Sequence, residues 1–127
     1  MIRHHVRPDG LPPTNGYSHA VAFNGLVSVS GQVPLDAEGR LVGPNDAEAQ
    51  VRQVFDNLRA ALAAADAGLD QVVKLTVFLT DLNDLEVFRR VRDAYFDTDA
   101  PPASSLVQVA GLANPAFRIE IEALAAV

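Results

Sequence analysis

Residues 72–96, VVKLTVFLTDLNDLEVFRRVRDAYF, contain a change of hydrophobic period that decides the fold class. Residues 72–80 are rich in β-branched types and place apolar side chains at alternate positions, which predicts a β-strand. Residues 83–96 repeat apolar side chains at three- and four-residue steps, which predicts an amphipathic helix. Asn83 and Glu86 have the spacing of a capping box at the start of that helix. The middle of the chain therefore predicts a strand followed directly by a helix.

The sequence on either side of this unit predicts one more helix and five more strands. Asn45 and Glu48 have the spacing of a capping box, and apolar side chains over 51–65 repeat at helical spacing until Gly68 provides a C-terminal stop. The resulting order, β-β-β-α-β-α-β-β, predicts an α+β fold in which both helices cover the apolar face of one sheet. The further strands are expected at residues 2–6, 18–23, 26–30, 104–109 and 117–124.

Composition limits the chemistry that this chain can perform. With 127 residues, 49% apolar and 20% charged, the sequence predicts a single globular domain over residues 1–127. The absence of cysteine excludes disulfides and thiol nucleophiles. A net charge of −6 with a single lysine argues against nucleic acid as a partner, because phosphate binding depends on clustered lysine and arginine.

The sequence also favours a cytoplasmic protein without a membrane partner. No apolar run approaches the roughly 20 residues that span a bilayer. Residues 1–5 contain no apolar signal segment, so we expect a mature cytoplasmic chain.

Alternation along the strands predicts two different sheet faces. One face carries apolar side chains from the strand at 72–80, at positions 73, 75, 77 and 79. The other face is mixed, and we interpret it either as a solvated surface or as a surface that meets another copy of the chain. The second interpretation follows from Phe78 and Leu106, two large apolar side chains that are expected among the polar ones. The residues expected on this mixed face are Lys74, Thr76, Phe78, Leu106, Gln108, Arg118, Glu120 and Glu122.

The residues that could carry metal or nucleophilic chemistry do not form a recognisable site. His4 and His5 are adjacent, so on a strand they point apart, and His19 is distant in sequence; no metal site is predicted. Ser104 and His19 could join an aspartate in a triad, but nothing resembles a nucleophile elbow. Glu120 and Glu122 are either general bases or surface charges, and Glu120 is the better candidate for a base.

Six motifs, read together and in order, resemble one known family. They are 16-GYSH-19, 30-SGQVP-34, 56-DNL-58, 73-VKLTVFLTDLNDL-85, 102-PASS-105 and 119-IEIEA-123. Over nearly the whole chain this set resembles the RidA/YjgF superfamily, also called endoribonuclease L-PSP-like proteins. The resemblance implies a chorismate-mutase-like (YjgF-like) fold, with two helices on one face of a mixed sheet, and a homotrimer with clefts between subunits. It also implies hydrolysis of reactive enamines and imines, such as 2-aminoacrylate, to 2-keto acids and ammonia without a cofactor or metal.

The resemblance assigns roles to matched positions in a small-molecule cleft. Tyr17 matches the tyrosine that reaches the ligand, and Ser30 and Gly31 match the strand end that lines the pocket. Glu120 matches the carboxylate that positions or activates the attacking water. That role suits the chemistry, because an imine carbon needs a water delivered from one side and a proton acceptor close by.

Two matched positions depart from the pattern of the family's deaminases. Ser104 stands where those members have an arginine, and Leu106 stands where they often have a cysteine. A guanidinium binds a carboxylate through two charge-assisted hydrogen bonds, whereas a serine hydroxyl offers a single neutral bond. We interpret Ser104 as a pocket-lining hydroxyl that leaves room for a larger or less acidic ligand. The pattern supplies no base that would make it a nucleophile.

Three residues are candidates for a replacement cation in the cleft. Arg89 matches a position where some members place an asparagine that lines the cleft, and the alternative is a solvated arginine on the helix surface. Arg118 shares a strand face with Glu120 by alternation, which is also compatible with surface exposure. His19 lies two residues after Tyr17 and by strand alternation can point the same way.

Three functions therefore remain open from the sequence. The first is a trimeric hydrolase acting on an imine, enamine or related C–N compound, with Glu120 holding the water. The second is a non-catalytic metabolite-binding or chaperone-like trimer, which the absence of the arginine favours. The third and weakest is a ribonuclease, since the chain is acidic and has no histidine pair at a suitable spacing.

Overall fold

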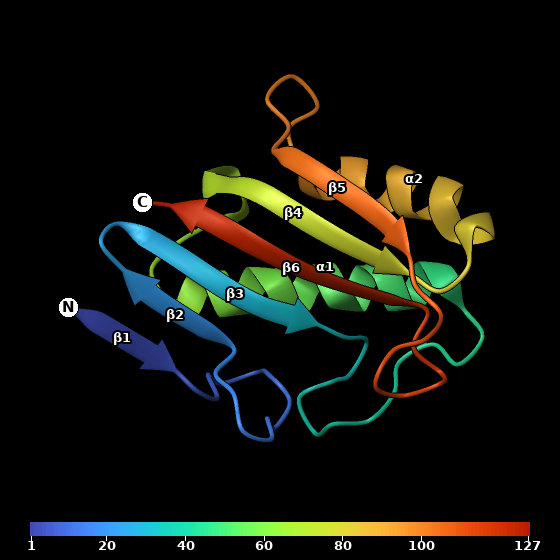
Figure 1. Ribbon diagram of the computed structural model, residues 1–127, viewed down its shortest axis with the longest axis horizontal. Coiled ribbons are helices and arrows are strands. Elements are labelled where there is room, and N and C mark those ends of the chain that lie inside the picture. The colour runs from blue at the N-terminus through green and yellow to red at the C-terminus, as the bar shows by residue number, and fades with distance from the viewer.

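The computed structural model describes all residues 1–127 and confirms the predicted order of elements (Figure 1). Short 3₁₀ turns at Leu69–Gln71 and Leu82–Asp84 precede the fourth strand and the second helix respectively. No helix is long and apolar enough to cross a membrane. The strands are β1 (Ile2–His5), β2 (Ala20–Phe23), β3 (Leu26–Gln32), β4 (Val72–Leu79), β5 (Ala103–Gln108) and β6 (Ile119–Ala126), and the helices are α1 (Ala47–Ala64) and α2 (Leu85–Tyr95).

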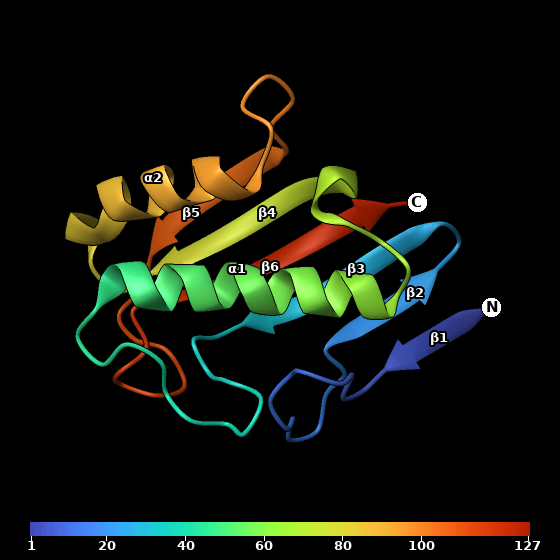
Figure 2. The same ribbon diagram turned by 180° about the vertical axis from the view of Figure 1, so that it is seen from behind.

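The strands form a single mixed sheet with the order β1-β2-β3-β6-β4-β5, and the turn at Leu69–Gln71 leads directly into β4. Only the β4–β5 pair is parallel, and α2 makes the crossover between these two strands. Both helices lie on the same side of the sheet, behind it in Figure 1 and in front of it in Figure 2. The α+β architecture with two helices on one face of a mixed sheet is therefore confirmed.

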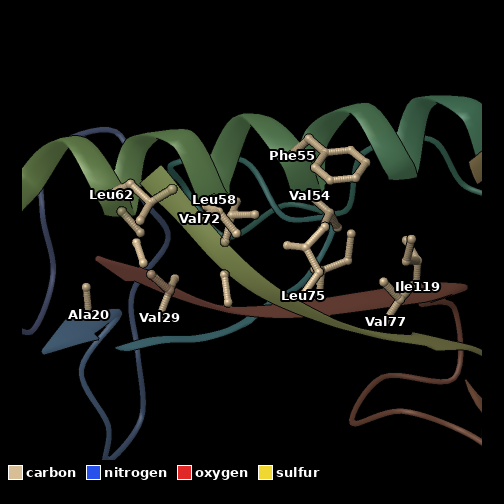
Figure 3. Packing of buried hydrophobic residues seen from close by; sticks show 14 of the residues in the cluster. Ala20, Val29, Val54, Phe55, Leu58, Leu62, Val72, Leu75, Val77 and Ile119 are labelled. Carbon is tan, nitrogen blue, oxygen red and sulfur yellow. The ribbon is translucent and has the colours of Figure 1, made fainter. Parts of the chain in front are cut away.

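The hydrophobic core lies between α1 and the sheet (Figure 3). Phe55, Leu58 and Leu62 project from the helix onto the strands, where Leu75 and Ile119 are among the side chains that they meet. Phe55 also joins the two helices, because its ring stacks on those of Phe88 and Tyr95 in α2, at centroid distances of 6.0 and 5.0 Å.

The helix starts differ from the capping boxes that the sequence predicted. At α1 the cap is Asp46, whose carboxylate accepts a hydrogen bond from the Ala49 backbone N–H at 3.1 Å. Asn45 precedes the cap and has a φ of +58°. The predicted capping box of Asn45 and Glu48 is therefore wrong.

The start of α2 and the end of α1 also differ from their predicted signals. Before α2, Asp81 rather than Asn83 accepts the capping hydrogen bond, from the Asn83 backbone N–H at 2.9 Å. At the end of α1, Asp66 has φ of +59° and donates its N–H to the Ala63 carbonyl at 3.0 Å. This residue, not Gly68, provides the left-handed turn that ends the helix.

The two faces of the sheet differ from the prediction at two places. The β4–β6 register shifts between Val72 and Lys74, a bulge that buries Val72 and leaves Val73 44% exposed. On β5, the parallel register pairs Leu106 with Val77 on the helix side, and Leu106 packs against the core. The mixed face therefore carries Ser105 and Val107 from β5, and the placement of Leu106 and Gln108 there was wrong.

Candidate functional site

The end of β3 and the start of β6 form one wall of an open hollow of about 530 Å³. We call it the Glu120 hollow. It brings together Tyr17, Ser30, Gly31 and Glu120, four of the residues to which the sequence resemblance assigned a cleft role. Its remaining lining residues are Val33, Leu35, Ala113, Phe117 and Glu122.

An irregularity in β3 shapes this hollow. The β3–β6 pairing runs from Val29 opposite Ala123 to Gln32 opposite Ile121, so β3 advances one residue more than β6 over this interval. The bulge contains Gly31. A Cβ atom at that position would collide with the Glu120 carboxylate and lie 2.7 Å from its Cδ and 2.9 Å from its Cγ. Glycine at this position therefore leaves the space in which the Glu120 side chain lies.

Replacing Gly31 by alanine tests this packing. We expect Gly31→Ala to lower the free energy of unfolding by about 1–2 kcal/mol, since overpacking forces neighbouring groups to move. The effect should largely disappear in a Glu120→Ala background, where the colliding atoms are absent. Urea denaturation of the four proteins in this double-mutant cycle measures the coupling.

Gly111→Ala is the matched control, since a Cβ there meets nothing within 4 Å. It should leave stability almost unchanged. Additive effects of Gly31→Ala and Glu120→Ala would contradict the proposed contact.

Glu120 is the residue with the most distinctive electrostatics in the hollow. Burial raises its pKa above the usual 4.5, and the nearby Glu122 carboxylate raises it further. No side chain or backbone N–H of the protein donates a hydrogen bond to its carboxylate, and no cation pairs with it. A half-buried carboxylate of this kind can hold a water molecule and accept a proton from it.

A buried hydrogen-bond chain supports the strand end beside Glu120. His19 Nε2 donates to the Pro12 carbonyl at 2.7 Å, since a carbonyl can only accept. His19 Nδ1 is then free to accept from Gln32 Nε2 at 3.2 Å, and Gln32 also donates to the Ser30 carbonyl at 3.1 Å. His19 is only 3% exposed. This arrangement favours a positioning role for His19 over the cleft cation suggested from the sequence.

Tyr17 and Ser30 differ in how their hydroxyls are used. The Ser30 hydroxyl donates to the Ser18 carbonyl at 2.6 Å, which fixes the strand end to the segment before β2. The Tyr17 ring packs edge-on against His19 at 6.2 Å between centroids and is 47% exposed. Its hydroxyl makes no hydrogen bond within the chain, so it can serve a ligand in the hollow.

Two buried amides of α1 hold the loops around the hollow. Asn57 Nδ2 donates to the carbonyls of Val33 and Leu35, at 3.0 and 2.9 Å. Gln50 Nε2 donates to the Ala116 carbonyl at 3.0 Å and its Oε1 accepts from the Arg118 backbone N–H at 2.8 Å. Neither role was predicted from the sequence. The signal was present, because the two amides lie seven residues apart on the apolar stripe of the helix.

The remaining predicted site residues lie elsewhere in the chain. Ser104 borders a second depression of about 310 Å³ beside the end of α2, which we call the Ser104 hollow. Arg89 is exposed on α2 and lines neither hollow. Leu106 packs against the core. The Ser104 hollow is lined by Leu75, Arg92, Asp93, Phe96, Asp97, Thr98, Pro101, Pro102 and Ser104.

Arg118 does not extend into the Glu120 hollow as a free cation. Its Nε and Nη2 donate to the two carboxylate oxygens of buried Asp84, at 2.8 and 2.9 Å. The structure contains no group of three or more histidine, cysteine, aspartate or glutamate side chains that could hold a metal ion. The side chains around the Glu120 hollow are two carboxylates, the Tyr17 phenol, the Ser30 hydroxymethyl group and several apolar groups, and none of them is a cation.

Comparison with known proteins places this geometry in a family. The family model described as Endoribonuclease L-PSP matches residues 8–127. A RutC family protein from Synechocystis sp. is 39% identical over 114 residues, which are 89% of this chain and 87% of the relative. The crystal structure of RidA from the Antarctic bacterium Psychrobacter sp. has a TM-score of 0.89 and 36% identity, with 98% of this chain and 100% of that chain covered.

The structure of E. coli TdcF with bound serine is also similar, with a TM-score of 0.81, 33% identity, and 100% of this chain and 98% of that chain covered. These matches extend over nearly the whole chain and confirm the YjgF-like fold. The chain belongs to the RidA/YjgF superfamily.

Proposed function

We propose that this protein is a cytoplasmic homotrimeric hydrolase that converts an imine, enamine or related C–N compound to a carbonyl product and ammonia. The single observation that carries the proposal is the Glu120 carboxylate. It is half-buried, has no partner within the chain, has a raised pKa, and borders a hollow in which Gly31 leaves it space.

The site becomes complete in this proposal only when two copies meet. The Glu120 hollow and Ser104 are separate features of one chain, and Ser104 lies on β5, the last strand of the sheet. The open sheet face supports such a contact. There Glu120 pairs across strands with Phe78, and Phe78 pairs with Val107, which is 46% exposed. This row runs from the Glu120 hollow to the free edge of the sheet, and association would cover its apolar side chains.

The proposed reaction uses the groups of the chain itself. Glu120 holds a water molecule and accepts one of its protons as the oxygen attacks the C=N carbon. Glu120 passes this proton to the nitrogen, which gives a carbinolamine. Glu120 then accepts the proton of the new hydroxyl group and returns it to the amino group, so that the carbinolamine collapses to the carbonyl product and ammonia and the carboxylate is regenerated. In this proposal the Tyr17 hydroxyl donates a hydrogen bond to the substrate, and Ser104 of the neighbouring copy lines the opposite side of the cleft. Water is the only co-reactant.

The first experiment is hydrolysis of 2-aminoacrylate and its imino tautomer, generated in situ from serine by a dehydratase. Pyruvate formation is timed against spontaneous decay, and sedimentation measures the oligomeric state of the same sample. Acceleration by the trimer supports the proposal. No acceleration of this imine, or of imines generated from other amines by an amine oxidase, in a well-folded trimer would contradict it.

A second candidate function is a non-catalytic trimer that binds a metabolite. The observation that favours it is the neutral Ser104 at the position where the family's deaminases carry a charged side chain. A Glu120→Ala variant that keeps ligand affinity and loses turnover identifies an enzyme. Ribonuclease activity, which the family model's description suggests, is the weakest candidate for a chain of net charge −6 with a single lysine.

A further inference from the structure

The charges around the Glu120 hollow all have the same sign. Two carboxylates, Glu120 and Glu122, line it, and no lysine, arginine or histidine does. Neither of the nearest cations lines the hollow. Arg118 forms a two-bond ion pair with Asp84. Lys74 borders a neighbouring depression on the open face together with Glu122, and its ammonium group donates to the Ser105 hydroxyl at 2.7 Å. A ligand beside Glu120 therefore meets a carboxylate that forms no ion pair within the chain.

The Ser104 hollow has no free cation either. Its only basic residue, Arg92, pairs with Asp93 at 3.0 Å and lies over the Phe88 ring. Asp97 adds a further carboxylate. The side of the proposed cleft opposite Glu120 is therefore neutral to negative, and Ser104 contributes only a hydroxyl.

We propose that the cleft selects substrates whose group next to the reacting carbon is neutral or cationic rather than a carboxylate, and that Ser104 sets this selectivity. The inference rests on the proposed function, because it joins the two hollows across a subunit contact. A substrate carboxylate in the hollow would share it with the Glu120 carboxylate and with no lysine, arginine or histidine, and like charges repel one another strongly in a partly desolvated site. An ammonium group would instead be attracted to the carboxylates, and an amide, which has no net charge, would be neither attracted nor repelled by their charge.

Three small ketones that share the acetyl group of such products provide the test. They are aminoacetone (cationic), pyruvamide (neutral) and pyruvate (anionic). Binding at low ionic strength is followed by amide chemical shifts of Ser30, Gly31 and Glu120 in the ¹⁵N-labelled protein. We expect aminoacetone to bind most tightly, and we expect the Kd of pyruvate to be at least about tenfold higher than that of aminoacetone. Pyruvate binding at least as tightly as aminoacetone, or no binding by any of the three, overturns the inference.

Two variants assign the selectivity to named side chains. Ser104→Arg is expected to improve pyruvate binding about tenfold or more, while Ser104→Met, which adds length without charge, keeps the wild-type order. Ser104 is exposed, so both side chains can be accommodated. Glu120→Gln should remove most of the advantage of aminoacetone over pyruvamide. Glu86→Gln is the charge-matched control, an exposed carboxylate on α2 outside both hollows, and should change nothing.

The outcome separates this inference from the proposed function. Selective binding of aminoacetone at the Glu120 amides without hydrolysis of any imine retains the selectivity and contradicts the hydrolase. Hydrolysis of 2-imino acids together with preferred binding of pyruvate retains the hydrolase and contradicts the selectivity.

Discussion

Replacing Glu120 by glutamine is expected to lower the turnover of an accepted imine by about 10²–10⁴-fold, the usual contribution of a positioned general base. The amide has the same shape but cannot accept a proton from water. Nothing in the chain donates a hydrogen bond to the carboxylate, so the substitution strands no partner and the fold should be retained. Single-turnover kinetics of the purified protein measure the loss. Unchanged turnover in Glu120→Gln would remove this residue from the mechanism.

The raised pKa of Glu120 gives an independent pH test of the same variant. Glu120 must be ionised to act as a base, so kcat/KM should decrease as the pH is lowered. The midpoint of this decrease should lie above pH 4.5, and the decrease should be absent in Glu120→Gln. Because the pKa in the folded protein exceeds that in the unfolded chain, the stabilisation that protonation provides is present below about pH 4.5 and is lost as the pH rises through the folded value. Thermal melts should therefore show Glu120→Gln gaining stability relative to wild type as the pH rises from 4 to 7.

The periodicity of the sequence was sufficient to predict the elements but not the residues that end them. The helices and strands appeared in the predicted order because alternation and helical spacing are imposed by burial. The caps were mistaken because Asn45 and Asp46 are adjacent and both suit a cap. The choice depended on which residue takes the left-handed conformation, and Asn45 does.

The orientation of β5 shows the limit of alternation as evidence. The sequence separated Ser104 and Leu106 from Ser105 and Val107, but each set contains one apolar residue. Alternation alone could not tell which set faces the helices. The parallel register with β4 decides it, and that register depends on long-range pairing.

The residues that line the Glu120 hollow could be predicted from the resemblance, whereas the buried side chains that support it could not. Glu120, Gly31 and Ser30 share one hollow as the resemblance implied. The supporting amides, Gln50 and Asn57, were missed because their partners are mostly backbone carbonyls, which carry no sequence signature. Ser104 lies apart from Glu120 within one chain, and their meeting in one cleft stays a prediction that depends on the association of two copies.

The Arg118–Asp84 pair is expected to have the largest effect on stability among the side-chain contacts near the site. The Asp84 side chain is 9% exposed, whereas that of Arg118 is 32% exposed. Arg118→Met therefore strands a buried carboxylate, and we expect it to lower the free energy of unfolding by about 3 kcal/mol. Asp84→Leu should be less damaging, because the arginine that it frees can reach water. Differential scanning calorimetry should show a decrease in Tm of about 10 °C for Arg118→Met.

Arg40→Met is the matched control, because Arg40 pairs with Asp36 at 3.3 Å but its side chain is 74% exposed, and surface pairs contribute little. The double variant Asp84→Leu/Arg118→Met should recover most of the lost stability, since the damage comes from an unpaired buried charge and not from the loss of attraction itself. Equal losses for Arg118→Met and Arg40→Met would contradict this account. Because Arg118 directly precedes β6, on which Glu120 lies, the double variant should recover turnover less completely than it recovers Tm.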